Sequence, residues 1–310
     1  EDFDLKLNNS EPRLVVEGLI TNKPGPYYVR LTKSKTNNIT SPEESRDENV
    51  DPVLDATVII KDDLNQIDTL KVIDIDMTGY LYSYEGYYYK PIYDESGKIV
   101  NKLVIPNNIA SCNKKGYYST SHLTGQAGHN YFLKIIWKGK EFESSAYMPS
   151  VPEIESLGYQ KKIAEKDGQE YYIPLLNFKE PQGIKNYYLI QLDKENDHYP
   201  GYPSSNWNFS ILADTQLDSY IKDLNVSLGA NPRGIEYATY SNGSSIYVAL
   251  NSLTVEAYNY YKNLIDQFDN DGGAYKPSPA TPPGNISNGA LGLFRASAVS
   301  EKQTYIKYSS

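Results

Sequence analysis

Residues 130–148, NYFLKIIWKGKEFESSAYM, decide the fold class. Apolar and polar side chains alternate along Asn130–Trp137 and again along Glu141–Met148, which is the two-residue period of a half-buried strand. Lys138, Gly139 and Lys140 separate the two runs, and a connection this short with a central glycine is typical of a tight turn. The stretch therefore predicts an antiparallel β-hairpin.

The same alternation extends outward in both directions. Arg13–Ile20 and Tyr27–Lys33 flank the turn composition Asn22-Lys23-Pro24-Gly25, so they predict a second hairpin. Further strands are expected at Ala56–Lys61, Ile67–Ile73, Tyr80–Tyr84, Gly116–Thr120, Ile154–Gln160, Glu170–Phe178, Asn186–Leu192, Trp207–Ala213, Ser245–Asn251, Ala290–Val299 and Thr304–Tyr308. We expect a mainly β protein built from two β-sandwich-like domains of the immunoglobulin or transthyretin kind.

Proline and polar stretches suggest how the chain is divided. The sequence PSVP at 149–152 interrupts the strands, so we place a first domain at 13–150 and a second at 151–310. Residues 1–12 are polar and read as a tether. One amphipathic helix is predicted over 253–268, with Asn251 and Ser252 as caps and an apolar face that packs on a sheet.

Composition excludes several classes of protein. The chain has 310 residues, with 30 Lys and Arg against 39 Asp and Glu, and a net charge of -9. It therefore lacks the basic footprint of a nucleic-acid-binding protein. Cys112 is the only cysteine, which excludes an internal disulfide and a cysteine zinc cluster. No apolar run approaches the roughly 18 residues of a membrane helix.

Residue types that act in catalysis or metal binding are scattered along the sequence. His122, His129 and His198 have neither a nucleophile motif nor a second ligand at metal-binding spacing. Residues 269–272, DNDG, imitate the middle of a calcium-binding loop, but Gln267 and Ser278 stand where its first and last carboxylates belong. We therefore predict no catalytic residue, no cofactor and no metal, with calcium at 269–272 as the alternative.

Tyrosine is the most unusual feature of the composition, since 30 Tyr accompany only 7 Phe. The phenol ring joins an apolar body to a polar tip and is frequent at contact surfaces. We expect Tyr80, Tyr82 and Tyr84 to cover the sandwich core. Two groups on loops are predicted to form an interface: Tyr87, Tyr88, Tyr89 and Tyr93 in a long loop, and Tyr199, Tyr202 and Trp207.

Three stretches, at 14–34, 128–154 and 282–297, resemble a family of outer-membrane lipoproteins from Bacteroidota that carry the domain of unknown function 4249. The last stretch, PPGNISNGALGLFRAS, is the most specific. Its glycines and asparagines suit a tight bend before Leu291 and Phe294 enter the core, so we interpret it as structural. Its motif residues are Pro283, Gly284, Asn285, Ile286, Gly289, Gly292 and Phe294.

This resemblance implies a location and a role. The chain would follow an acylated cysteine ahead of Glu1, sit on the outer membrane facing the cell exterior, and dock on a β-barrel, such as a TonB-dependent transporter of the starch-utilisation type. Its task would be ligand capture or assembly, without catalysis. Asp68-Thr69-Leu70 resembles an acceptor for O-linked glycans at Thr69. The alternatives are a secreted glycan- or peptide-active enzyme, whose carboxylates folding would bring together, and a glycan-binding module.

Overall fold

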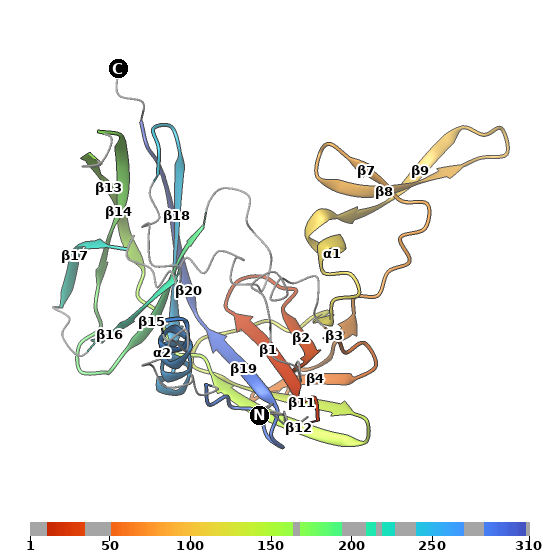
Figure 1. The fold of residues 1–310 in the computed structure, drawn as a ribbon, viewed down its shortest axis with the longest axis horizontal. Helices are drawn as coiled ribbons and strands as arrows, with labels where there is room; N and C mark the ends of the chain where they lie inside the picture. The colour runs from red at the N-terminus through yellow and green to blue at the C-terminus, as the bar shows by residue number, and fades with distance from the viewer. Residues whose placement is uncertain are drawn as a thin grey trace, which may run out of the picture.

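We analysed the protein in a computed structural model, which describes residues 11–34, 51–163, 168–193, 209–214, 219–226, 240–269 and 282–307 (Figure 1). These residues form twenty strands and two helices. The mainly β fold with a sandwich-like arrangement is therefore confirmed. Neither helix in the described ranges is long and apolar enough to cross a membrane.

The first sandwich contains both hairpins that the sequence predicted. Its first sheet has the order β19-β1-β2-β10-β6, with β3 paired to β2. Its second sheet has the order β12-β11-β4-β5. The strands are β1 (Leu14–Thr21), β2 (Tyr28–Lys33), β3 (Asp51–Pro52), β4 (Thr57–Asp62), β5 (Ile67–Thr69), β6 (Lys71–Val72), β10 (Tyr117–Ser119), β11 (Asn130–Trp137), β12 (Lys140–Tyr147) and β19 (Leu291–Ser297). The single strand expected at 67–73 is divided between the two sheets.

Two residues with positive φ form the turn of the hairpin between β11 and β12. Lys138 has φ 49° and Gly139 has φ 72°, so both central residues of the turn are left-handed. That pair of angles belongs to the two-residue turn whose twist matches the flanking strands. Trp137 and Lys140 are consequently direct cross-strand neighbours, and alternate residues of β11 face the core.

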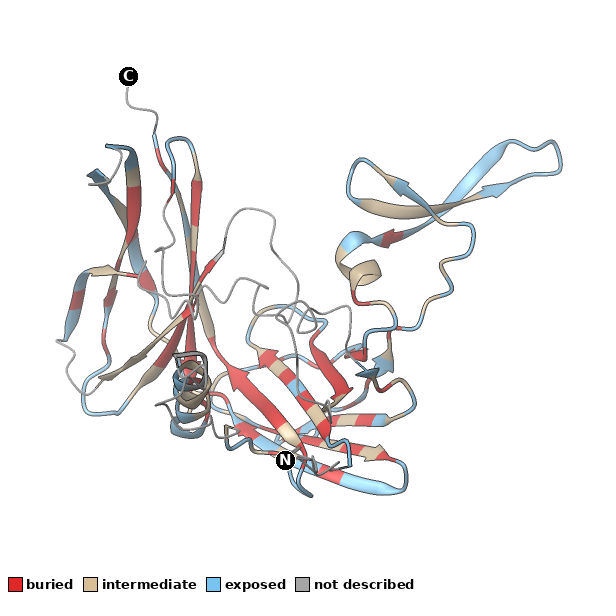
Figure 2. Ribbon diagram, in the orientation of Figure 1, coloured by how far each residue is buried: buried red, intermediate tan, exposed pale blue. Residues whose placement is uncertain are grey.

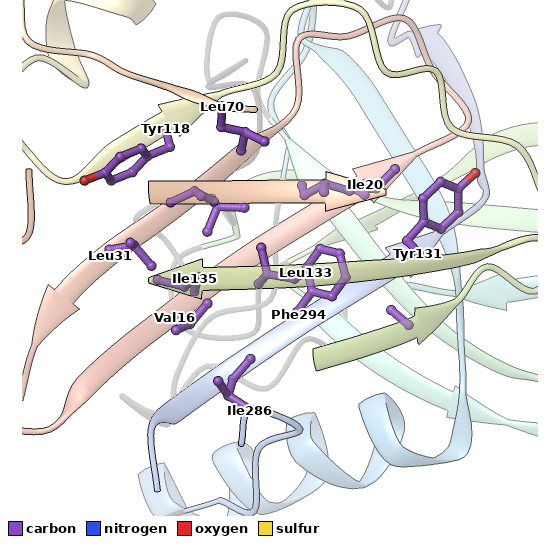
Figure 3. Packing of buried hydrophobic residues seen from close by; sticks show 14 of the residues in the cluster. Val16, Ile20, Leu31, Leu70, Tyr118, Tyr131, Leu133, Ile135, Ile286 and Phe294 are labelled. Atoms are coloured by element: carbon purple, nitrogen blue, oxygen red, sulfur yellow. The ribbon is translucent and has the colours of Figure 1, made fainter. Parts of the chain in front are cut away.

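Side chains from both sheets of the first sandwich interlock between them. The core includes four almost fully buried side chains from β1, β2 and β11: Val16, Leu31, Leu133 and Ile135 (Figure 3). Phe294 of β19 joins them with no exposed surface. Burial of this apolar surface is the main stabilising term for the sandwich.

The second sandwich packs its own core. One sheet has the order β13-β14-β17 and the other the order β16-β15-β18-β20. Leu176, Phe178, Ile246 and Leu250 are fully buried between the two sheets. The strands are β13 (Ile154–Ile163), β14 (Glu170–Lys179), β15 (Tyr187–Asp193), β16 (Phe209–Ala213), β17 (Tyr220–Asn225), β18 (Ser245–Leu253) and β20 (Val299–Tyr305).

The predicted helix is α2 (Val255–Asp269), and it packs against strands of both sandwiches. Tyr261 lies in a cluster with Phe209 of β16 and Leu293 of β19. The expected caps are wrong, because Asn251 and Ser252 are buried residues of β18. Thr254 takes that role, and its hydroxyl oxygen accepts a hydrogen bond from the Ala257 N–H at 3.3 Å.

The chain returns to the first sandwich near its C-terminal end. β19 pairs in parallel with β1, placing Val15 beside Leu291 and Thr21 beside Ser297. The stretch 286–298 thus contributes to the core formed by 14–148, although it lies in the second half of the sequence. A contiguous division at 150/151 does not describe the packing of this stretch.

The glycine-rich motif at 283–294 holds β19 in its position beside β1. Gly292 has φ 97°, and a Cβ built there would lie 2.0 Å from the Val16 carbonyl oxygen. The Asn285 side chain accepts from the Phe294 N–H at 2.9 Å and donates to the Phe294 carbonyl at 2.6 Å. Asn288 donates to the Glu141 carbonyl. Phe294 enters the core as expected, whereas Leu291 stays half-exposed and lies outside it, contrary to expectation.

Candidate functional site: the tyrosine arm

A small sheet stands away from both sandwiches. It consists of β7 (Leu81–Ser83), β8 (Tyr87–Tyr93) and β9 (Ile99–Pro106), followed by the short helix α1 (Asn107–Ser111), and we call these elements the arm. The strands are antiparallel in the order β7-β8-β9. Figure 1 shows the arm projecting from the body, and Figure 2 shows it almost entirely in the colours of half-buried and exposed residues.

The structure of the arm differs from two of the sequence predictions. The loop predicted for Tyr87, Tyr88, Tyr89 and Tyr93 is wrong, because these residues form the central strand β8. The idea that Tyr80–Tyr84 cover the sandwich core is also wrong, since Tyr84 is fully exposed on the arm. β9 was not predicted at all, although its sequence IVNKLVIP is rich in β-branched residues, which are frequent in strands.

Both faces of the arm are apolar. On one face the register places Tyr89 between Leu81 and Val104, and on the other it places Tyr88 between Tyr82 and Ile105. Leu81 is 52% exposed and Val104 is 48% exposed. Within the described ranges, only β8 lies between β7 and β9, and no second sheet covers either face. Ile105 is buried and α1 packs beside β8 and β9, so the face of Leu81 and Val104 is the more open one, and an exposed apolar face of this kind marks a contact surface.

Aromatic contacts support the arm, one between β7 and β8 and one along β8 itself. The ring centroids of Tyr82 and Tyr88 are 5.2 Å apart at an interplanar angle of 61°, and those of Tyr87 and Tyr89 are 6.3 Å apart. Edge-on aromatic pairs contribute beyond the area that they bury. The rings therefore stiffen a sheet that has no core of its own, and a stiff surface loses little entropy when it binds.

The strands of the arm carry two charges, both positive. Lys102 donates a hydrogen bond to the Tyr87 hydroxyl at 3.0 Å, and its Nζ lies 4.9 Å from the Tyr87 ring centre. That hydrogen bond raises the pKa of Lys102, so its ammonium stays charged at neutral and mildly alkaline pH. Lys90 lies over the Tyr80 ring on the opposite face. The strands of the arm are thus cationic, whereas the turns between them add Glu85, Asp94, Glu95 and Lys98.

Asn113 fixes the base of the arm. Its side chain accepts from the Ile75 N–H at 2.7 Å and donates to the Ile75 carbonyl at 3.0 Å, joining the outgoing and returning segments. Tyr28, Ile73, Cys112 and Tyr117 form a small buried cluster directly beneath. The arm consequently leaves the body through a packed, hydrogen-bonded base.

Thr69, the predicted glycan acceptor, lies on the edge strand β5. Its neighbours Asp68 and Leu70 point inward and are buried, so Thr69 itself is exposed. An exposed hydroxyl on an edge strand is accessible for modification. We expect the peptide containing Thr69, released by protease from protein purified from the native host, to carry a hexose-sized or larger mass increment. Thr69→Ala should remove it, and an unmodified wild-type peptide would refute the assignment.

A groove of about 730 Å³ crosses the outer face of the second sheet of the first sandwich, beside residues 285–287. Lys61 lies over the Phe132 ring at 5.6 Å, and Lys134 pairs with Glu141 at 2.8 Å. The groove's polar groups already serve the fold, because the Ser287 hydroxyl accepts from the Glu143 N–H and the Asn285 amide is bound to Phe294. The arm is therefore the stronger candidate for a functional surface.

Several predicted residues fall outside the part of the chain that the structure describes. These are Tyr199, Tyr202 and Trp207, and residues 270–272 of the possible calcium loop. Across the described ranges, no three His, Cys, Asp or Glu side chains are grouped closely enough to hold a metal ion. His129 bonds Asp63 at 2.8 Å, and His122 lies 2.9 Å from the Ile67 carbonyl oxygen, so both histidines have local structural partners.

Comparison with known proteins gives a family and no activity. No curated protein matches the chain. One family model does, that of the domain of unknown function DUF4249, and its match covers residues 1–303. Since this is nearly the whole chain of 310 residues, the resemblance noted in the sequence is confirmed at the level of the family. The protein belongs to the DUF4249 family.

Proposed function

We propose that the protein is a non-enzymatic, lipid-anchored subunit on the outside of the outer membrane, which uses its arm to dock on a β-barrel complex. The partner would be a TonB-dependent transporter of the starch-utilisation type or another outer-membrane assembly, and docking would aid ligand capture or assembly. A covalently attached lipid would supply the anchor.

The observation that carries this proposal is the arm. It places apolar and aromatic side chains, among them the exposed Leu81, Tyr82 and Val104, away from either sandwich core, on strands held by a packed base. Stable protein contacts bury at least roughly 1,000 Å² in total, and a projecting sheet can present both faces to a partner that surrounds it. Tyr87–Tyr93 form the central strand of this projecting sheet, where a partner can reach them from outside the sandwiches (Figure 1).

Co-purification tests the proposal. The tagged full-length protein would be recovered from its native membrane in mild detergent, and accompanying proteins identified by mass spectrometry. We expect an outer-membrane β-barrel protein to accompany the wild type. The double variant Leu81→Glu with Val104→Glu should reduce its recovery at least about tenfold, since each charge lies in a desolvated contact.

Ile163 and Ile184 provide a matched control. Both are 65% exposed on the second sandwich, so Ile163→Glu with Ile184→Glu makes the same chemical change away from the arm. Recovery of the barrel protein with this control should equal that of the wild type. A wild-type protein that is recovered alone, or an arm variant that retains its partner, would count against the proposal.

A further inference from the structure

The outer side of β9 is an unpaired strand edge. β9 has eight residues, and β8 is its one neighbouring strand within the described ranges. All of Ile99–Val104 are exposed. Such an edge presents free N–H and C=O groups and accepts a further strand from another molecule.

The register shows which backbone groups face outward. In an antiparallel pair, alternate residues turn their N–H and C=O groups toward the partner strand and away from it. The Lys102 N–H is bonded at 2.8 Å to the side-chain oxygen of Asn101 and so faces away from β8. Val104 and Pro106 lie two and four residues after Lys102, so their backbone groups also face away from β8. Pro106, which has no N–H, pairs with Tyr87.

Natural sheets block such edges with inward charges, prolines, bulges or covering loops. Along Asn101–Ile105 this protection is limited to one side chain. Lys102 leans back over the rings of Tyr87 and Tyr89, which keeps its ammonium on the face of the arm. The Asn101 side-chain oxygen accepts a hydrogen bond from the outward N–H of Lys102, and rotation of the Asn101 side chain would free that N–H.

We propose that β9 accepts an extended strand of a partner protein, with a carboxylate placed opposite Lys102 and an apolar side chain opposite Val104. The idea rests on the proposed function in taking the docked protein as the source of this strand. Lys90 and Lys102 are the charged residues of β7–β9, and the Lys102 ammonium bonds the Tyr87 hydroxyl while Glu85 acts on it through space. Opposite charges on neighbouring strands stabilise their pairing.

The same charge disfavours a second copy of this chain as the occupant. Antiparallel pairing of β9 with itself, centred on Leu103, would place Lys102 opposite Val104 of the second copy and bring the two ammonium groups to diagonal positions on the same face. Like charges on neighbouring strands destabilise pairing. A foreign strand with an acidic residue has no such cost.

A defined peptide tests the edge directly. Fluorescein-labelled Ser-Val-Ile-Glu-Val-Val-Ser would be titrated with the purified full-length protein, and binding followed by fluorescence anisotropy. A second peptide with lysine in place of glutamate is the control. We expect the glutamate peptide to bind about tenfold more tightly, since one attractive cross-strand pair replaces one repulsive pair. Lys102→Glu should reverse that preference.

Two backbone variants separate edge pairing from contact with the faces. Val104→Pro removes an outward N–H and should abolish peptide binding, while Val104→Thr keeps the N–H and should bind as the wild type does. Asn101→Ala frees the Lys102 N–H and should tighten binding several-fold. Equal binding by Val104→Pro and wild type, no binding by the wild type, or dimers of the free protein that Val104→Pro dissociates would each overturn the proposal.

The variants also distinguish this proposal from the broader one. If the barrel protein accompanies Val104→Pro as it does the wild type, but is lost with the Leu81→Glu and Val104→Glu pair, docking uses the faces and the edge proposal fails alone. If no barrel protein accompanies the wild type, yet the peptides follow the expected order, strand addition stands and the outer-membrane proposal fails.

Discussion

Replacing Gly292 by alanine is expected to lower the free energy of unfolding by about 4 kcal/mol, which is at the upper end for a single substitution. Two costs combine. The backbone angle φ of 97° is strained for any residue with a Cβ, and that Cβ would lie 2.0 Å from the Val16 carbonyl oxygen. Because that oxygen belongs to the backbone of β1, relief requires β1 and β19 to separate.

Urea denaturation followed by tryptophan fluorescence would measure this effect, because Trp137 is buried in the first core. Gly289 in the same motif is the matched control. It has φ 73°, and a Cβ there meets nothing within 4 Å, so Gly289→Ala should cost about 1 kcal/mol from the backbone angle alone. Equal losses from the two variants would show that the close approach to Val16 contributes nothing.

Asp68→Ala is expected to cost about 3 kcal/mol. The Asp68 carboxylate is fully buried and accepts hydrogen bonds from the backbone N–H groups of Ser121, His122 and Leu123 at 2.8–3.0 Å, and from the Ser121 hydroxyl. Truncation leaves these donors without their acceptor, and each unsatisfied buried donor costs about 1–3 kcal/mol before water reaches it. Unfolding by urea measures the loss.

The pH dependence provides an independent check on Asp68. Burial opposes ionisation, but the four hydrogen bonds outweigh it, so the pKa of Asp68 is lowered. A carboxyl whose folded pKa lies below its unfolded value adds stability above the unfolded pKa of about 3.9, and this stability is lost as pH falls toward the folded pKa. The stability difference between wild type and Asp68→Asn should therefore be constant above about pH 5 and shrink below pH 4.

Asp63→Ala serves as the comparison. Asp63 also accepts a backbone hydrogen bond, from Asn130, but it is half-exposed, so water can replace the lost acceptor. Its substitution should cost much less than that of Asp68. A pH-independent difference between wild type and Asp68→Asn down to pH 3 would contradict the assigned role of the Asp68 carboxylate.

Local patterns were sufficient for much of the fold. Alternation and a glycine turn located the hairpin of β11 and β12, because one face of each strand is buried and the other is not. The helix α2 was found from its apolar stripe. Its start was placed too early because Asn251 and Ser252 are buried polar residues of a strand, and they have the same residue types as a helix cap.

The arm could not be found in this way. Ile99–Val104 are exposed on both faces, so β9 lacks the contrast between buried and exposed sides on which sequence interpretation of strands depends. The tyrosines of β8 stood out in the composition, but without the unpredicted β9 they appeared to lie in a loop after the strand expected at Tyr80–Tyr84. The parallel pairing of β1 with β19 was equally hidden, since no local pattern specifies a partner strand so far along the chain.

The parallel pairing of β1 with β19 also constrains the order of folding. A nascent chain that ends before residue 291 has all of its first sheet except the edge strand that supplies Phe294. Its N-terminal half would expose the flank of β1 and an incompletely filled core until residues 291–297 emerge. Completion of the first sandwich therefore requires that synthesis has passed residue 297, and shorter chains keep an exposed strand edge.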